Sequence, residues 1–175
     1  MRKFPLWISF TWSVIFALII ETSLFPGIKL WPFAPFLVLQ FYRVTFVRAL
    51  WLSFFAGLIL DLFSSQFPFG VLAFIHTLTT LLLYNQRKHF FEDKVIAFSL
   101  YTALVSSFLS LLLILSSPFL GKQVPITIPL LISDLLLMPF SDAIYALLGF
   151  TLPSHLYFLV KKTILQKYFT QDENS

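Results

Sequence analysis

The sequence predicts an all-α protein, a polytopic membrane helix bundle of about six transmembrane helices. Of its 175 residues, 58% are hydrophobic and only 11% are charged, whereas a soluble domain carries about 25% charged residues. Apolar runs recur along the chain, and about 20 apolar residues cross a bilayer as a helix. The runs lack the two-residue alternation of a membrane β-barrel. Helices remain, because lipid offers no partner for free backbone groups.

Six apolar runs define the predicted spans, and Pro and Gly separate several of them. The first run follows Arg2 and Lys3 and has no small-residue cleavage site behind it, which indicates an uncleaved span rather than a signal peptide. We expect residues 1–152 to form one six-span membrane domain. The runs are Phe4–Leu24, Leu30–Tyr42, Phe46–Phe63, Phe69–Tyr84, Val95–Ser117 and Ile128–Phe150.

The second run, Leu30–Tyr42, is the weak span. Its thirteen residues would cover only about 20 Å as a helix. Pro32 and Pro35 lie near its start, where helices tolerate proline. The run either crosses a thinned bilayer or enters and leaves on one side.

Basic residues in the connecting loops predict the orientation. Six spans with both termini cytoplasmic place ten Lys and Arg in inside loops and two outside, Lys29 and Lys122, as the positive-inside rule requires. Five spans with the N-terminus outside give nine against three, so charge favours six spans and leaves five open. The ten inside residues are Arg2, Lys3, Arg43, Arg48, Arg87, Lys88, Lys94, Lys161, Lys162 and Lys167.

Residues 153–175 form a predicted cytoplasmic tail. Apolar and aromatic residues there accompany Lys161, Lys162 and Lys167, which indicates a basic, partly amphipathic helix on the membrane surface. A frayed continuation of the last span is the alternative. The net charge of +4 is spread over short loops, where it sets topology and does not indicate nucleic-acid binding.

Four carboxylates lie inside apolar runs, where charge is costly and normally faces protein or water. With six spans, Glu21, Asp61 and Asp134 lie toward the outer side, and Asp142 lies nearer the middle, just after Pro139. One interpretation is a polar cluster that lines a cavity or forms an interface. The other is that each acid is solvated at a membrane edge or capped by a nearby hydroxyl.

No pattern in the chain favours catalysis, a cofactor or a metal. Cysteine is absent and His76 is the one histidine within a span, so a metal lacks its usual ligands. There is no Walker A loop or Rossmann glycine pattern. Ser106 with His76 as nucleophile and base has no nucleophile elbow in support. We expect a non-enzyme in which His76 is hydrogen-bonded structure; an intramembrane hydrolase has no motif behind it.

The most distinctive stretch runs from Gly57 to Gly70. A span ends in G-x-x-x-D-L at Gly57–Leu62, passes through a short Ser/Pro turn, and reopens with Gly70 and another apolar span. This stretch resembles the rod shape-determining protein MreD family of bacterial inner membranes. The proline-led second span with Pro35, the basic loop after the fourth span and the short basic C-terminus are similar too.

The resemblance implies a non-enzymatic scaffold of the cell-elongation machinery in the bacterial inner (cytoplasmic) membrane, involved in cell shape and lateral peptidoglycan synthesis. Members work with the bitopic protein MreC, with the RodA–penicillin-binding-protein synthase and indirectly with actin-like MreB. The implied fold is similar to the substrate-binding subunits of energy-coupling-factor vitamin transporters. Gly57 would then allow close helix approach, Gly70 would make a sharp turn, and Asp61 would cap the next span.

The alternative function is a small-solute (vitamin-type) substrate-binding membrane subunit of a transporter. It needs an outward-facing pocket, for which Glu21, Asp61 and Asp134 are the available polar wall. A scaffold would instead present apolar faces to partner helices, and its loop Arg87–His89 would meet the cytoplasmic machinery or anionic lipid.

Overall fold

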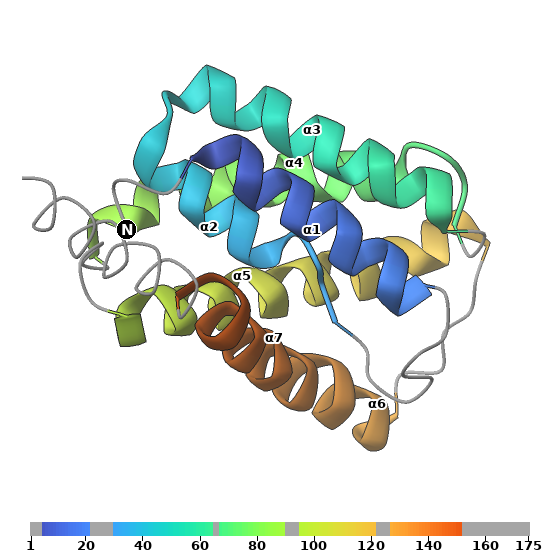
Figure 1. Ribbon diagram of the computed structural model, residues 1–175. Helices are drawn as coiled ribbons and strands as arrows, with labels where there is room; N and C mark the ends of the chain where they lie inside the picture. The colour runs from blue at the N-terminus through green and yellow to red at the C-terminus, as the bar shows by residue number, and fades with distance from the viewer. Residues whose placement is uncertain (1–4, 22–29, 65–66, 90–94, 122–126, 152–175) are drawn as a thin grey trace, which may run out of the picture.

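Helices account for all regular structure in the described part of the chain, which confirms the all-α prediction. The computed structural model describes residues 5–21, 30–64, 67–89, 95–121 and 127–151, drawn in Figure 1. The predicted tail, residues 153–175, lies outside these ranges. The elements are α1 (Leu6–Glu21), α2 (Ala34–Arg43), α3 (Phe46–Phe63), α4 (Val71–Leu83), η1 (Tyr84–His89), α5 (Val95–Ser116), η2 (Ser117–Leu120), α6 (Ile128–Ile132), η3 (Ser133–Leu137), α7 (Met138–Ala146) and η4 (Leu147–Thr151).

Three helical segments of the described ranges are long and apolar enough to cross a membrane, which indicates a membrane protein. They are Phe46–Phe63, Ile96–Leu120 and Ile128–Phe150. The other apolar helices are shorter: α1 has 16 residues and α4 has 13, or about 24 and 20 Å of helix. The six-span layout therefore remains a prediction.

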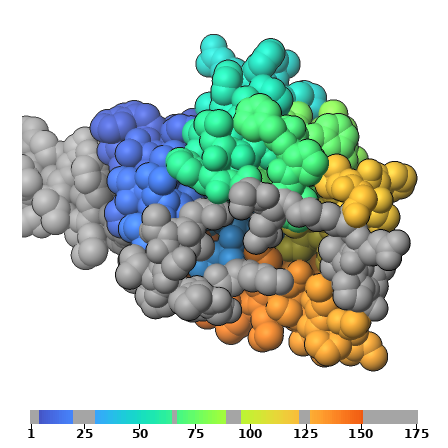
Figure 2. Space-filling view, turned by 90° about the vertical axis from the view of Figure 1, so that its right-hand side faces the viewer, coloured from blue at the N-terminus to red at the C-terminus, as the bar shows by residue number. Residues whose placement is uncertain are grey.

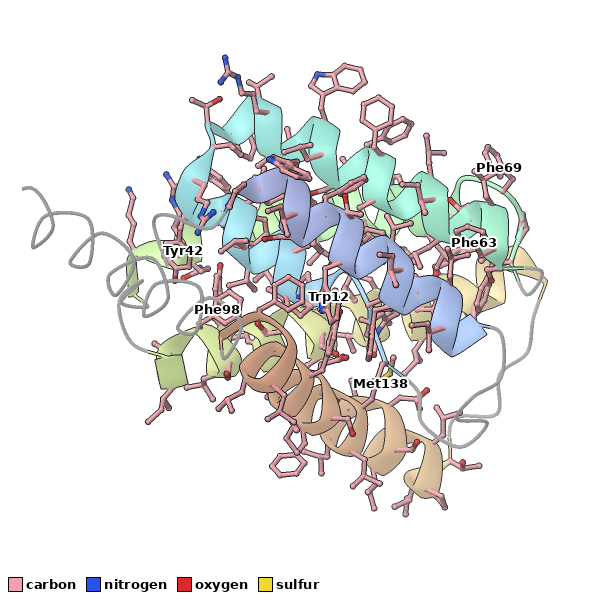
Figure 3. All side chains as sticks on the ribbon, in the orientation of Figure 1. Trp12, Tyr42, Phe63, Phe69, Phe98 and Met138 are labelled. Atoms are coloured by element: carbon pink, nitrogen blue, oxygen red, sulfur yellow. The ribbon has the colours of Figure 1, made fainter. Side chains whose placement is uncertain are left out.

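The bundle differs from a soluble protein because its outer surface is as apolar as its core and its interior also holds polar side chains. Large apolar side chains such as Leu62 and Phe74 face outward, whereas Gln40, His76 and Asp142 are fully buried. An apolar surface of this extent is unfavourable in water, and membrane lipid would shield it. Polar side chains inside a membrane bundle bind one another across helices. Figure 3 places aromatic side chains at both ends, with Phe63 and Phe69 at one and Tyr42 and Phe98 at the other.

Helix α2 lies in the middle of the bundle. Its residues Ala34–Phe41 are all buried, and α1, α3, α5 and α7 pack around it, as Figure 1 shows. With 10 residues it is about 15 Å long, and it begins inside the protein. The preceding residues, Trp31–Phe33, are buried but not helical. Irregular backbone at membrane depth is tolerated where protein buries it. The second apolar run is therefore a short helix, α2, preceded by a buried non-helical segment, Trp31–Phe33.

The last apolar run is helical from Ile128 to Thr151 but is interrupted by two π-helical turns, η3 and η4. Pro139 lies in the first turn of α7, directly after η3. Its missing N–H and its ring disturb the preceding turn of an α-helix, and a wider π turn accommodates such a disturbance. Figure 2 views the end of the bundle where this run begins and where α3 turns into α4.

Candidate functional site

Helices α3 and α4 approach each other closely at Gly57. A Cβ atom added to Gly57 would lie 2.7 Å from both the backbone nitrogen of Ala73 and the carbonyl oxygen of Leu72, and closer still to Cα of Ala73. Carbon atoms normally approach to about 3.5–4.0 Å, and these neighbours are backbone that cannot rotate away. A residue without a side chain is therefore required, and the close approach implied for Gly57 is present.

Asp61 lies one turn after Gly57 and is buried between the two helices. Its Oδ1 accepts a hydrogen bond from the N–H of Leu72 at 3.0 Å, and its Oδ2 accepts one from the N–H of Ala73 at 2.9 Å. The first amides of a helix have no carbonyl partner within it, and a carboxylate is favourable at the positive end of the helix dipole. Asp61 thus caps α4 from the neighbouring helix, as the resemblance implied.

Gly70 turns the chain into α4. Its φ of +96° and ψ of −12° lie where residues with a Cβ are strained. As the N-cap of α4 it has no side chain that could cap the helix, which explains why the cap comes from Asp61. Gly57, Asp61 and Gly70 therefore form one structural unit, the α3–α4 hairpin.

Asp61→Ala should lower the free energy of unfolding by about 2 kcal/mol, because two buried amides lose their side-chain acceptor. Asp61→Asn keeps one acceptor oxygen and should lose less. Thermal unfolding of the purified protein in detergent, followed by circular dichroism, measures both changes. Equal melting temperatures for Asp61→Ala and the unmodified chain would contradict the capping role.

A second buried carboxylate, Asp142 on α7, holds the non-helical approach to α2. Its Oδ1 accepts from the backbone N–H of Trp31 at 2.9 Å, and its Oδ2 accepts from the hydroxyl of Ser106 on α5. The indole N–H of Trp31 donates to Oγ of Ser110, one turn further along α5, at 3.0 Å. Trp31 is therefore attached to two helices that follow it by more than 70 residues.

Helix α2 has a hydrogen-bonding side chain near each end. Asp142 lies at its N-terminal approach, and Arg87 of η1 donates from its guanidinium to the carbonyl of Phe41 in its last turn. The guanidinium of Arg87 also lies 4.0 Å from the ring centroid of Tyr84. The guanidinium of Arg87 at the C-terminal end complements the helix dipole. Arg87 also satisfies a carbonyl in the last turn of α2, and Asp142 satisfies a backbone N–H just before the helix, neither of which lipid could do.

His76 on α4 is fully buried beside Trp31. Its Nδ1 lies 2.8 Å from the carbonyl oxygen of Leu72, and the two rings meet edge-on with centroids 5.5 Å apart. Its Nε2 has no partner among the described residues. Ser106, considered from the sequence as a nucleophile for His76, donates to Asp142 instead. The described ranges hold no group of three His, Cys, Asp or Glu suited to a metal.

A polar network that sequence reasoning missed joins α2, α3 and α4. The side-chain amide of Gln40 donates to Oγ of Ser53 at 2.6 Å, and that oxygen lies 2.5 Å from Oγ1 of Thr80. A single amide in an otherwise apolar run was the available signal for Gln40. Interhelical bonds of this kind fix the relative position of membrane helices.

Of the four candidate acids, the two that are buried, Asp61 and Asp142, do not act as one group. Asp61 and Asp142 bind separate sets of partners. Asp134 is half-buried in the π-helical turn η3, and Glu21 is the last residue of α1, with a side chain outside the described part. Pro35 lies in the first turn of α2, as expected for a proline that opens a helix.

The chain matches no protein-family model, no curated protein and no solved structure. The α3–α4 hairpin and the attachments of α2 are therefore the observations that bear on function.

Proposed function

We propose that the chain is an MreD-like scaffold of the bacterial cell-elongation machinery, with six spans in the inner membrane and both termini in the cytoplasm. The supporting observation is the α3–α4 hairpin. The three residues that carry the resemblance lie in this one hairpin: Gly57 at the close approach of the two helices, Asp61 on the first amides of α4, and Gly70 at its N-cap. These residues hold α3 and α4 together, which is a structural role and is consistent with a scaffold.

The buried polar groups support the same proposal. Both carboxylate oxygens of Asp61 and both of Asp142 are occupied by groups of the chain itself. The outer surface, by contrast, offers apolar faces along α3, α5 and α7, and partner helices pack on such faces through shape. Its partners would be an MreC-like bitopic protein and a RodA–penicillin-binding-protein synthase, with actin-like MreB reached indirectly.

A substrate-binding subunit of a vitamin-type transporter is the second candidate, and one observation favours it. Helix α2 is a half-helix inside the bundle, and interrupted helices form the substrate sites of many transporters. The carboxylate of Asp61, which the sequence offered as pocket wall, is instead engaged by backbone amides. A vitamin that stays bound to the purified chain at one per molecule would establish this candidate in place of the scaffold.

Depletion of the protein should convert rod-shaped cells into rounded ones, because lateral wall synthesis would lose its placement. Expression of the unmodified chain should restore rods, and the Gly57→Leu/Asp61→Ala variant should not. Ser107→Ala is a matched control, because Ser107 donates to the Ala103 carbonyl within its own helix; it should restore rods. Microscopy of cell shape is the measurement, and rods that persist after complete depletion would refute the proposal.

A further inference from the structure

One side of α3 carries an exposed cation followed by exposed aromatic rings. Arg48 is exposed in the first turn, and Trp51 and Phe55, 59% and 51% exposed, follow on the same face at spacings of three and seven. The rings of Trp51 and Phe55 lie 6.2 Å apart between centroids, and Phe54 contacts both. Cation and rings thus form one continuous outward surface.

Lys88 brings a second cation to the same end of the bundle. Tyr84 at the start of η1 donates from its hydroxyl to the Val44 carbonyl at 2.7 Å, and its ring centroid lies 5.1 Å from that of Phe46. These contacts place η1 beside the start of α3. Lys88 is exposed in η1. Neither Lys88 nor Arg48 has a partner among the described residues, whereas Arg87 is engaged by Phe41 and Tyr84.

We propose that this surface binds an anionic phospholipid. Its phosphate would lie on Arg48, with the charge of Lys88 at the same end of the bundle adding to the attraction, and an acyl chain would lie along Trp51, Phe54 and Phe55. A phospholipid matches both parts, because its charge and its apolar chain are adjacent, as they are here. Arg48 also lies at the positive end of α3, whose first turn holds no acid. A cation alone is unfavourable there, and a bound phosphate would neutralise it.

The test is native mass spectrometry of the full chain in detergent, titrated with dioleoyl phosphatidylglycerol or dioleoyl phosphatidylcholine. The unmodified chain should retain the anionic lipid preferentially. Arg48→Gln/Lys88→Gln should reduce the affinity for phosphatidylglycerol by about fivefold for each cation removed. Its affinity for phosphatidylcholine should not change. Trp51→Ala/Phe55→Ala should weaken both lipids.

Two control variants show whether a loss of lipid binding comes from this surface, rather than from a lower net charge or from misfolding. Lys29→Gln/Lys122→Gln removes the same charge from loops that the sequence assigns to the opposite side, and its lipid binding should not change. Arg48→Lys/Lys88→Arg retains charge and should bind as the unmodified chain does. Equal retention of phosphatidylglycerol by Arg48→Gln/Lys88→Gln and by the unmodified chain would overturn the proposal.

Two further ligands test whether Arg48 and Lys88 bind a different anion instead of a phospholipid. Glycerol 3-phosphate carries the phosphate without acyl chains and should bind at least about tenfold more weakly, because apolar contact with the rings is lost. Equal affinity for glycerol 3-phosphate would assign the surface to a soluble phosphate. A polyglutamate peptide that binds in an Arg48-dependent manner, with no preference between the two lipids, would assign it to an acidic protein and overturn the lipid.

Discussion

Asp142→Ala should destabilise the purified protein by about 3 kcal/mol. The substitution leaves the backbone N–H of Trp31, in the buried segment before α2, with no acceptor, and the hydroxyl of Ser106 loses its partner. Each buried polar group without a partner costs about 1–3 kcal/mol. The non-helical segment before α2 would then lose its attachment to α7, so we expect the loss to be large. Thermal unfolding in detergent measures it.

Two graded variants show which bond of Asp142 matters. Asp142→Asn keeps an oxygen that can accept from the Trp31 N–H and should retain most of the stability. Ser106→Ala removes one donor to the carboxylate, and its effect should lie between those of Asp142→Asn and Asp142→Ala. A melting temperature of Asp142→Ala equal to that of the unmodified chain would show that α2 is not held at this point.

Gly57→Leu is the second change for which we expect a large effect, with a loss of about 4 kcal/mol or failure to fold. The new side chain would overlap backbone atoms of Leu72 and Ala73 from its Cβ onward. Overpacking alone costs about 1–3 kcal/mol. Here the helices must also separate, which draws the Leu72 and Ala73 amides away from Asp61 and removes the cap of α4. The yield of monodisperse protein after detergent extraction, together with its melting temperature, measures the loss.

Gly149→Ala is the matched control for the hairpin. A Cβ at Gly149 would lie no closer than 3.0 Å to a side chain, the ring of Tyr145, whereas a Cβ at Gly57 would overlap backbone, so its cost should be smaller than that of Gly57→Ala. Because Gly57 and Asp61 both contact the backbone of Leu72 and Ala73, the double variant Gly57→Ala/Asp61→Ala should lose less stability than the sum of the single variants. Strict additivity, or equal stability of the Gly57 and Gly149 variants, would contradict the hairpin unit.

Much of the helical layout was predictable, because membrane helices show a strong local signal. The predicted third span, Phe46–Phe63, coincides with α3, and its limits are marked by Thr45 and Ser64. For the second run, Leu30–Tyr42, the sequence did not predict where the helix begins. Whether its first residues continue the helix depends on the bond from Trp31 to Asp142, which lies 111 residues away, and no local pattern encodes such a contact.

The same distinction holds for the candidate site. Gly57, Asp61 and their partners at Leu72 and Ala73 lie within one hairpin, and the family resemblance of that one stretch was the signal that implied how they meet. The polar attachments of α2 join residues from distant parts of the chain. Trp31 offered no signal within an apolar run, and Asp142 showed only that some buried partner was needed.

Crosslinking in native membranes, followed by affinity capture of the full chain, tests the proposed scaffold most directly. We expect crosslinks to an MreC-like bitopic protein and to a RodA–penicillin-binding-protein synthase, strongly reduced in Gly57→Leu and retained in Ser107→Ala. Capture of a transporter ATPase pair in their place, at equal protein levels, would contradict the account.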